Sequence, residues 1–250
     1  MKPTKLGYIL SLDEFKNYEP DKKEKFKNLI VAESNLIEGI DSNNIKTRII
    51  KEEESEEDFM AREFPEVTNH KKALDYVIIN FESKVLSQRD ILFLHKTLGE
   101  NLISEAGTYR RHKCYIKWLC EDYENYSGKT HFRQIPNLMQ NLEKDINNLE
   151  KKEFTLEKIL NVHHKFETIH PFSDGNGRVG RLILNWLTLR HNKEFYVIEA
   201  KKRKEYYDEI KIYEKKFKKA HPEIKFYKDR RISRSDIFFR ELEEINSDLE

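Results

Sequence analysis

The sequence predicts an all-α fold, mainly helical, with one small β-hairpin. Apolar residues recur at helical spacing over most of the chain, and capping residues stand where several of these segments begin. Aromatic residues gather between Gly107 and Pro136, and this texture favours short strands. The 250 residues suit one large domain with extensions.

The helices are predicted from their buried faces. The first five cover about 22–38, 66–81, 88–98, 135–149 and 156–169, with N-caps at Ser87 and Thr155 and a stop at Gly99. A sixth helix buries Leu182 to Leu187, and a seventh carries a stripe formed by Tyr206, Ile210, Tyr213 and Phe217. The last helix carries Ile237, Phe238, Leu242 and Ile245. The stripe is read as core and not as a surface for stacking bases. The hairpin is expected to pair Lys113–Trp118 with Thr130–Phe132, with a turn signal at Ser127-Gly128.

Composition restricts the class of protein. Hydrophobic residues make up 38% and charged residues 36% of the chain, so a heavily charged, soluble surface is expected. The formal net charge of +1 gives no overall argument for binding nucleic acid or membranes. No apolar run approaches the roughly 18 residues of a membrane span, and the first residues lack a signal-peptide pattern. Cys114 and Cys120 are too few for a disulfide scaffold, so a cytoplasmic location is expected.

Charge blocks suggest how the chain is divided. Lys51–Asp58 is a nearly continuous acidic run, read as a solvated connector, and Lys201–Arg231 carries thirteen basic residues against six acidic ones. The expected division is an N-terminal helical segment at 1–65, a core domain at 66–215 and a basic helical extension at 216–250.

The residues from His170 to Arg181 carry the chemistry. They read His-Pro-Phe-Ser-Asp-Gly-Asn-Gly-Arg-Val-Gly-Arg and hold three of the eight glycines in the chain. Taken alone, His170 could cap the end of a helix, and Asp174 could cap the start of the next. Each also has a functional reading, because histidine is a general base near neutral pH and a carboxylate can bind Mg²⁺.

The rest of the segment predicts a site for phosphate groups. Gly175, Asn176 and Gly177 can turn successive N–H groups toward one anion at the start of a helix, and the Asn176 side chain adds a donor. Arg178 and Arg181 share one face of the first turn, where cations oppose the helix dipole. Two arginines in this place are unfavourable unless an anion joins them, which indicates a polyphosphate ligand.

At these residues the chain resembles the Fic (Fic/Doc) family, whose pattern HPFx[D/E]GNGRxxR is met at every fixed position. The resemblance extends over roughly residues 70 to 215: Gly107-Thr108-Tyr109-Arg110 and the hairpin resemble the family's flap, and residues 203–207 resemble the helix beside its nucleotide pocket. It implies transfer of AMP from ATP, with Mg²⁺, to a Ser, Thr or Tyr hydroxyl of a target protein or of the protein itself. The implied roles are a base (His170), a Mg²⁺ ligand (Asp174), phosphate or nucleotide contacts (Gly175, Asn176, Gly177, Arg178, Arg181, Tyr206 and Tyr207) and docking of the target on the flap (Cys114, Tyr115, Ile116 and Lys117).

A second pattern lies near the N-terminus. Residues 34–39, Ser-Asn-Leu-Ile-Glu-Gly, resemble the family's inhibitory motif, on a helix at about 22–40. Taken alone they describe a helix that ends at Gly39, with Glu38 an ordinary exposed carboxylate. The resemblance implies that Ser34, Glu38 and Gly39 form an inhibitory element, with Glu38 in a bidentate pair with Arg181 that takes the place of the γ-phosphate.

Other readings stay open. Glu38 could instead support the removal of AMP from a modified protein. The basic block could serve a regulator associated with nucleic acid. The chain could also be a binding module that uses nucleotide only as a ligand. Nucleic acid and membranes are not expected as partners, whereas a second copy of the chain is a candidate partner.

Overall fold

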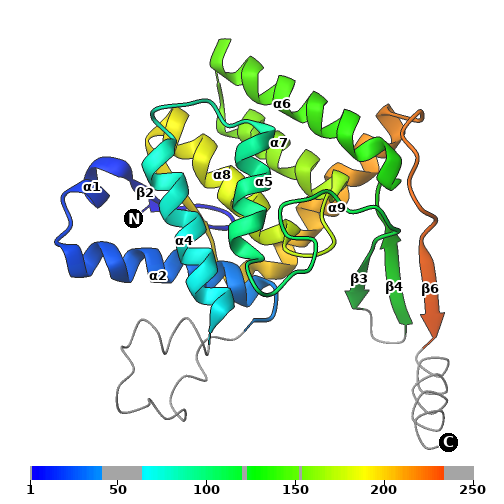
Figure 1. The fold of residues 1–250 in the computed structure, drawn as a ribbon, viewed down its shortest axis with the longest axis horizontal. Helices are drawn as coiled ribbons and strands as arrows, with labels where there is room; N and C mark the ends of the chain where they lie inside the picture. The colour runs from blue at the N-terminus through cyan, green and yellow to red at the C-terminus, as the bar shows by residue number, and fades with distance from the viewer. Residues whose placement is uncertain (1, 41–63, 120–122, 152–153, 234–250) are drawn as a thin grey trace, which may run out of the picture.

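The structure is a computed structural model. It describes residues 2–40, 64–119, 123–151 and 154–233. The mainly helical fold is confirmed (Figure 1). The helices are α1 (Leu12–Lys16), α2 (Pro20–Ile37), α4 (Pro65–Asn80), α5 (Gln88–Leu98), α6 (Ile135–Lys151), α7 (Leu156–Ile169), α8 (Asn176–Asn192) and α9 (Arg203–Ala220), with single 3₁₀ turns at Phe132–Gln134 and Ala200–Lys202.

Helix α8 is the centre of the bundle. Nearly all of its residues are buried, and it packs against α7, α4, α5 and α2. Val179, Leu182, Ile183 and Trp186 have no more than 1% of their surface exposed. Because α8 begins within the His170–Arg181 segment, that segment is anchored to a helix buried along most of its length.

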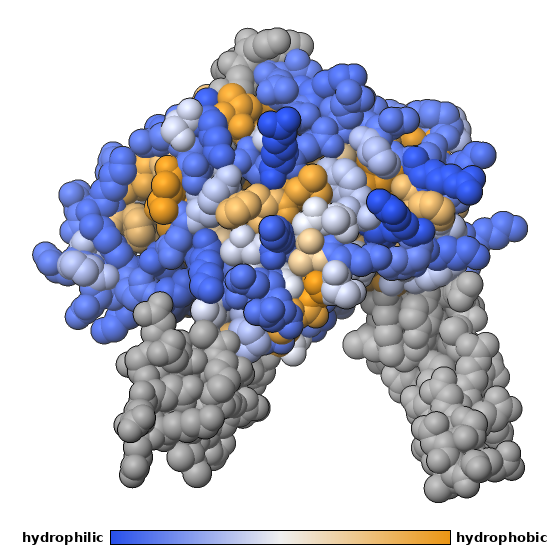
Figure 2. Space-filling model, viewed as in Figure 1, coloured by the Kyte–Doolittle hydropathy of each residue, from blue (hydrophilic) through white to orange (hydrophobic). Residues whose placement is uncertain are grey.

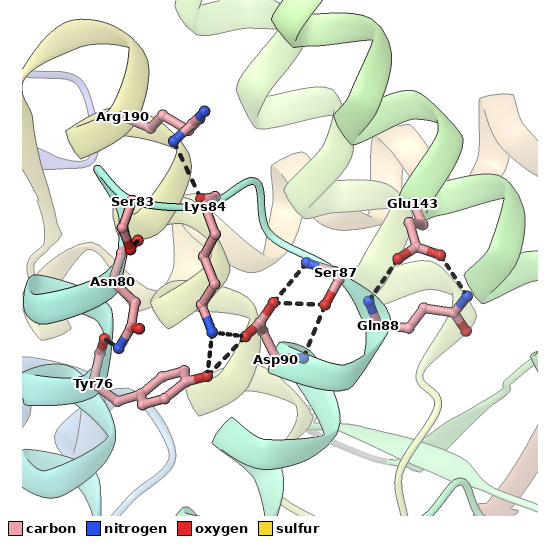
Figure 3. A network of polar contacts seen from close by, with 9 residues as sticks. All are labelled: Tyr76, Asn80, Ser83, Lys84, Ser87, Gln88, Asp90, Glu143 and Arg190. Atoms are coloured by element: carbon pink, nitrogen blue, oxygen red, sulfur yellow. Dashed lines mark hydrogen bonds and ion pairs between the residues drawn. The ribbon is translucent and has the colours of Figure 1, made fainter.

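The start of α5 is fixed by polar contacts on both sides (Figure 3). Ser87 and Asp90 form a capping box, as the expected N-cap at Ser87 requires, and Lys84 pairs with the Asp90 carboxylate at 2.6 Å. The Gln88 backbone and side chain both donate to Glu143 of α6. These bonds fix the position of α5 along its axis, beside α6 and α8. Helix α5 supplies one wall of the site described below.

A small sheet that the sequence did not predict joins the N-terminal segment to the segment between α8 and α9. Strands β1 (Lys2–Pro3), β2 (Gly7–Ser11) and β5 (Glu194–Ile198) run antiparallel in the order β1-β2-β5. Gly7 pairs with Ile198, and a Cβ at Gly7 would lie 2.0 Å from the Val197 carbonyl oxygen. The N-terminal segment is therefore strand as well as helix, and its pairing places α2 against the start of α9.

The flap has three strands, and the expected pairing of its hairpin was wrong. Strand β3 (Tyr115–Leu119) pairs with β4 (Tyr123–Gly128), which in turn pairs with β6 (Arg230–Ser233). Gly128 ends a strand and does not form the turn: the Tyr227 carbonyl oxygen would lie 2.0 Å from a Cβ there, so the glycine permits a close backbone approach. Thr130 bridges to Phe226 instead of to β3.

Residues 216–220 of the expected helical extension complete α9, whereas residues 221–229 form turns and irregular structure that lead to β6. Pro222 follows the end of α9, as its lack of an N–H requires. The acidic run at 51–58 and the expected helix at 237–245 lie outside the described residues. In the described stripe, Tyr206, Ile210 and Phe217 are buried, as expected of a core stripe, and Tyr213 is half-buried.

The outer surface matches the composition. Figure 2 shows a face that is mostly hydrophilic, with a smaller hydrophobic area near its centre. No helix in the described ranges is both long and apolar enough to cross a membrane.

Candidate active site

The His170–Arg181 segment forms a tight connection between α7 and α8. The helix α7 ends at His170, as expected of a residue before proline, and the backbone of His170 is left-handed (φ 52°, ψ 65°). Gly175 is also left-handed (φ 74°) and stands at the N-cap of α8. A non-glycine residue in this region is uncommon and indicates a locally enforced backbone, so the surroundings determine where the His170 ring lies.

The Asn176 side chain fastens this connection. Its Oδ1 accepts from the Phe172 N–H and its Nδ2 donates to the Phe172 carbonyl, both at 2.9 Å. Asn176 is buried and lies inside α8. Its amide therefore holds the loop, and the expected contact of Asn176 with an anion stays a prediction.

His95 of α5 supports the same loop and was missed in the sequence. Its ring stacks on Phe172 with centroids 3.7 Å apart. The Gly107 N–H donates to Nδ1 at 2.9 Å, so Nε2 carries the hydrogen that reaches the Asp174 carbonyl at 3.1 Å. Burial lowers the pKa of His95 to about 4, which keeps this tautomer neutral. The only sequence signal was a histidine within an apolar stripe.

The Asp174 carboxylate points outward and is 73% exposed. Its Oδ1 accepts from the Gly175 N–H at 2.6 Å, and its Oδ2 lies 3.6 Å from Arg178 Nη2. The described residues contain no cluster of three or more ligating side chains. A single accessible carboxylate still fits Mg²⁺, which completes its octahedron with water and phosphate oxygens.

Arg178 is a buried cation with spare hydrogen-bonding capacity. Its side chain is 5% exposed, and Nε and Nη1 have no acceptor among the described residues. Leaving donors of a buried guanidinium unpaired is costly, so the site is suited to an anion with several oxygens. The phosphate contact expected at Arg178 stays a prediction, and the unpaired donors support it.

Arg181 is held by the end of α2. Its Nε donates to Ser34 Oγ at 2.7 Å, and its Nη2 donates to the Ser34 carbonyl at 2.8 Å and to Glu38 Oε1 at 2.7 Å. The expected bidentate pair with Glu38 was wrong, because a single carboxylate oxygen makes the contact, Ser34 accepts from Nε and Nη2, and Nη1 has no acceptor among the described residues. Although burial opposes its charge, Glu38 raises the pKa of Arg181, which stays protonated.

Glu38 and Gly39 lie where α2 ends. Glu38 is the C-cap residue, and Gly39 has a left-handed backbone (φ 81°). A Cβ on Gly177 would lie 2.2 Å from Glu38 Oε1 and 3.1 Å from Arg181 Nη1. The carboxylate thus rests on the backbone of the first turn of α8, beside the glycine loop.

Tyr206 and Tyr207 lie behind Arg181. The Tyr206 ring centroid is 5.8 Å from the Arg181 guanidinium carbon, and the residue is 1% exposed. Its hydroxyl meets His163 Nε2 at 3.0 Å, and His163 Nδ1 meets the Gly180 carbonyl at 2.9 Å. Tyr207 donates to the Ile37 carbonyl at 3.4 Å. Both tyrosines therefore border the arginine and the end of α2. The sequence did not identify His163 as a residue of the site.

The His170 ring has an electropositive and partly apolar setting. Burial lowers its pKa, and the nearby cations of Lys129 and Arg110 lower it further. Its Nδ1 is enclosed and makes no hydrogen bond to the described residues. The ring is therefore neutral near pH 7, as a proton acceptor must be.

The start of the flap borders the loop. Cys114, Tyr115 and Ile116 are half-buried, and the Cys114 carbonyl accepts from the Lys129 N–H at 3.0 Å. Burial raises the pKa of the Cys114 thiol, and Asp174 is close enough to raise it slightly. Lys117 lies in β3, and its side chain is outside the described set.

Known proteins are similar to this chain over the region that holds the site. Residues 85–188 match the model of the Fic/DOC family. The chain is 28% identical over 145 residues to protein adenylyltransferase Fic of Aedes aegypti, covering 56% of this chain and 27% of the relative. It is 29% identical over 155 residues to the protein of the same name from Drosophila melanogaster, covering 60% and 30%. The chain thus spans less than a third of these relatives.

Solved structures share the fold. A Fic-domain-containing signalling protein from Bacteroides thetaiotaomicron superposes with a TM-score of 0.61 at 20% identity, over 80% of this chain and 78% of the other. A fragment of Fic-1 from C. elegans gives a TM-score of 0.57 at 22% identity, over 80% and 61%.

Proposed function

Because residues 85–188 form a Fic/DOC family domain, we propose that this protein is a self-inhibited protein adenylyltransferase. It transfers AMP from ATP to a Ser, Thr or Tyr hydroxyl of a target protein, or of itself. The name of the curated relatives supports the reaction class. The observation that carries the proposal is Arg178, a buried guanidinium at the start of α8 whose Nε and Nη1 have no acceptor among the described residues.

In the proposed reaction His170 accepts the proton of the target hydroxyl. The hydroxyl oxygen forms a bond to the α-phosphorus of ATP, the bond from that phosphorus to the bridging oxygen breaks, and pyrophosphate leaves. The N–H groups at the start of α8 and the Arg178 guanidinium bind phosphate oxygens. Asp174 would hold Mg²⁺, which would supply neutralisation of the phosphate charge. The flap residues Cys114–Lys117 dock an extended segment of the target by strand addition.

Self-inhibition is proposed from the contacts of Arg181. This arginine is the proposed partner of the γ-phosphate, and Ser34 and Glu38 occupy its Nε and Nη2. An incoming polyphosphate must displace Glu38 or bind in another position, in which the α-phosphorus is misplaced for attack. The Glu38 carboxylate is the only negative charge in this set, so removing it should free the arginine.

Intact-mass spectrometry tests the proposal. Wild type, Glu38→Gly and Glu38→Gly/His170→Ala are incubated with Mg²⁺ and each nucleoside triphosphate. The expected result is an added AMP on Glu38→Gly with ATP and none on the double variant. A Glu38→Gly protein that binds ATP but transfers nothing, to itself or to proteins of a lysate, contradicts the proposal.

One observation favours a second candidate, the hydrolytic removal of AMP from a modified protein. Only Oε1 of Glu38 contacts Arg181 in the described structure, so Oε2 remains able to accept a proton from water. In that case Glu38→Gly abolishes release of AMP from a modified target instead of promoting transfer.

A further inference from the structure

Arg110 is a buried arginine that binds backbone carbonyls. It is 1% exposed. Its Nε donates to the His170 carbonyl at 2.8 Å, its Nη1 to the His112 carbonyl at 2.8 Å and its Nη2 to the Thr130 carbonyl at 2.6 Å. Within the described ranges no carboxylate pairs with it. A buried guanidinium satisfied in this way has a geometric task, because its planar fork fixes the directions of several acceptors at once.

The three acceptors belong to three different segments. His170 ends α7 and carries the proposed base, His112 leads into the flap, and Thr130 leads out of it. The Arg110 N–H also donates to the Pro171 carbonyl at 2.9 Å. Arg110 thus ties the base to both ends of the flap through backbone groups.

The bond to the His170 carbonyl bears directly on the ring. His170 has the left-handed backbone described above, a conformation that costs a non-glycine residue free energy. Fixing the carbonyl fixes the peptide plane, and with it the direction of the Cα–Cβ bond. A displacement of the ring by about 1 Å is enough to lower the rate of a transfer reaction by about 10²-fold.

Charge adds to the geometry. The charged and titratable groups that act on the His170 ring are Lys129 and Arg110, and both favour the neutral imidazole, whereas the backbone of Glu167 acts in the opposite direction. Lys129 is in turn balanced by the Glu214 carboxylate. Arg110 has no such counter-ion among the described residues, so its charge acts on the ring without local cancellation.

We propose that Arg110 is a positioning residue for the proposed AMP transfer, which holds the His170 base in register with the flap that docks the acceptor hydroxyl. The inference rests on the proposed function, since it takes His170 as the base.

The test uses the full chain with Glu38→Gly as parent. Arg110→Lys keeps a cation but loses the fork, and Arg110→Gln loses both. Arg111→Gln is the matched control, because Arg111 is the exposed neighbour. Transfer of AMP is expected to fall by about 10²-fold in both Arg110 variants, with the affinity for ATP unchanged, and to stay at the parent rate in Arg111→Gln.

An NMR titration of the His170 ring separates positioning from general loss of structure. The pKa of His170 is expected to rise in Arg110→Gln and to stay low in Arg110→Lys, although both transfer slowly. If Arg110→Gln does not fold, Arg110→Lys carries the test. Transfer at the parent rate in Arg110→Lys, or an unchanged His170 titration in Arg110→Gln, overturns the inference. A parent that transfers no AMP contradicts the proposed function instead, and the titration can still be read.

Discussion

Gly177 and Glu38 are fitted to one another: a Cβ at position 177 would lie 2.2 Å from Glu38 Oε1 and 3.0 Å from its Cδ. The glycine that the phosphate loop requires is thus also the surface on which the glutamate rests. Space for the nucleotide and space for the glutamate are therefore set by the same backbone atoms.

This fit predicts that the effect of Gly177→Ala on the free energy of unfolding changes sign with the residue at position 38. In the wild type the methyl group must push the Glu38 carboxylate away, and a cost of about 1–3 kcal/mol in the free energy of unfolding is expected. In Glu38→Gly the clash with the carboxylate is absent, the remaining close contact of 3.1 Å is with the flexible end of the Arg181 side chain, and alanine favours the helix by about 1 kcal/mol. Urea denaturation of the four proteins measures the coupling, and additive effects would contradict the fit.

Ser34→Ala is expected to release the arginine only in part. The variant loses the bond from Arg181 Nε to Ser34 Oγ but keeps the bonds to the Ser34 carbonyl and to Glu38. A hydrogen bond to a charged group contributes roughly 1.5–3 kcal/mol. The rate of AMP incorporation should lie between those of wild type and Glu38→Gly. The same substitution in the Glu38→Gly background should add little, and a large additive gain there would refute this account.

Glu167 should make stability depend on pH. Burial raises the pKa of its carboxyl from 4.5 to about 7, so the folded state holds a proton that the unfolded state has already released. Stability is lost as the pH rises from about 4.5 to about 7, by roughly 3 kcal/mol at most. Glu167→Gln should remove this loss.

The measurement is the free energy of unfolding across that pH range, compared between wild type and Glu167→Gln. The buried histidines act in the opposite sense, but they are common to both proteins and cancel in the difference. Glu157→Gln, on the exposed side of the same helix, is the control. A difference that stays flat with pH would show that Glu167 is ionised throughout.

The ion pair between Lys129 and Glu214 should be a strong link between the flap and α9. The Lys129 side chain is fully buried and that of Glu214 is 7% exposed, and Ser127 Oγ donates to Glu214 at 3.0 Å. Glu214→Gln is expected to cost about 3–5 kcal/mol, because a buried charge loses its counter-ion. Lys218→Met removes the more exposed partner of Glu214 and should cost less than about 1 kcal/mol. Thermal unfolding of both variants decides the order, and equal losses would contradict it.

The helices could be predicted because their signals are local. The capping box at Ser87, the N-cap at Thr155 and the stop at Gly99 lie within a few residues of the helices that they bound. Strand β2 had no such signal, because it pairs with β5 across the whole bundle. The hairpin was misread at Gly128, whose glycine serves an approach by Tyr227 from far along the chain.

The candidate site divides in the same way. The residues from His170 to Arg181 are contiguous, and their chemistry could be read in order. His95, Arg110 and His163 act on that segment only through packing, which places α5, the start of the flap and α7 against it. Each of them contacts a backbone carbonyl of that segment, and a backbone carbonyl leaves no mark in a sequence.

The position of Glu38 at the end of α2 determines how the proposed inhibitory contact with Arg181 can be released. Strand β2 pairs with β5, the Glu33 carboxylate accepts from the Ala200 N–H at 2.6 Å, and Tyr207 holds the Ile37 carbonyl. The body of α2 is therefore held against the bundle up to its last turn, and Glu38 is the C-cap residue that follows it. In the proposed self-inhibition, release of Arg181 therefore requires the unwinding of only the last turn of α2, which carries Ser34 and is followed by Glu38 and the left-handed Gly39.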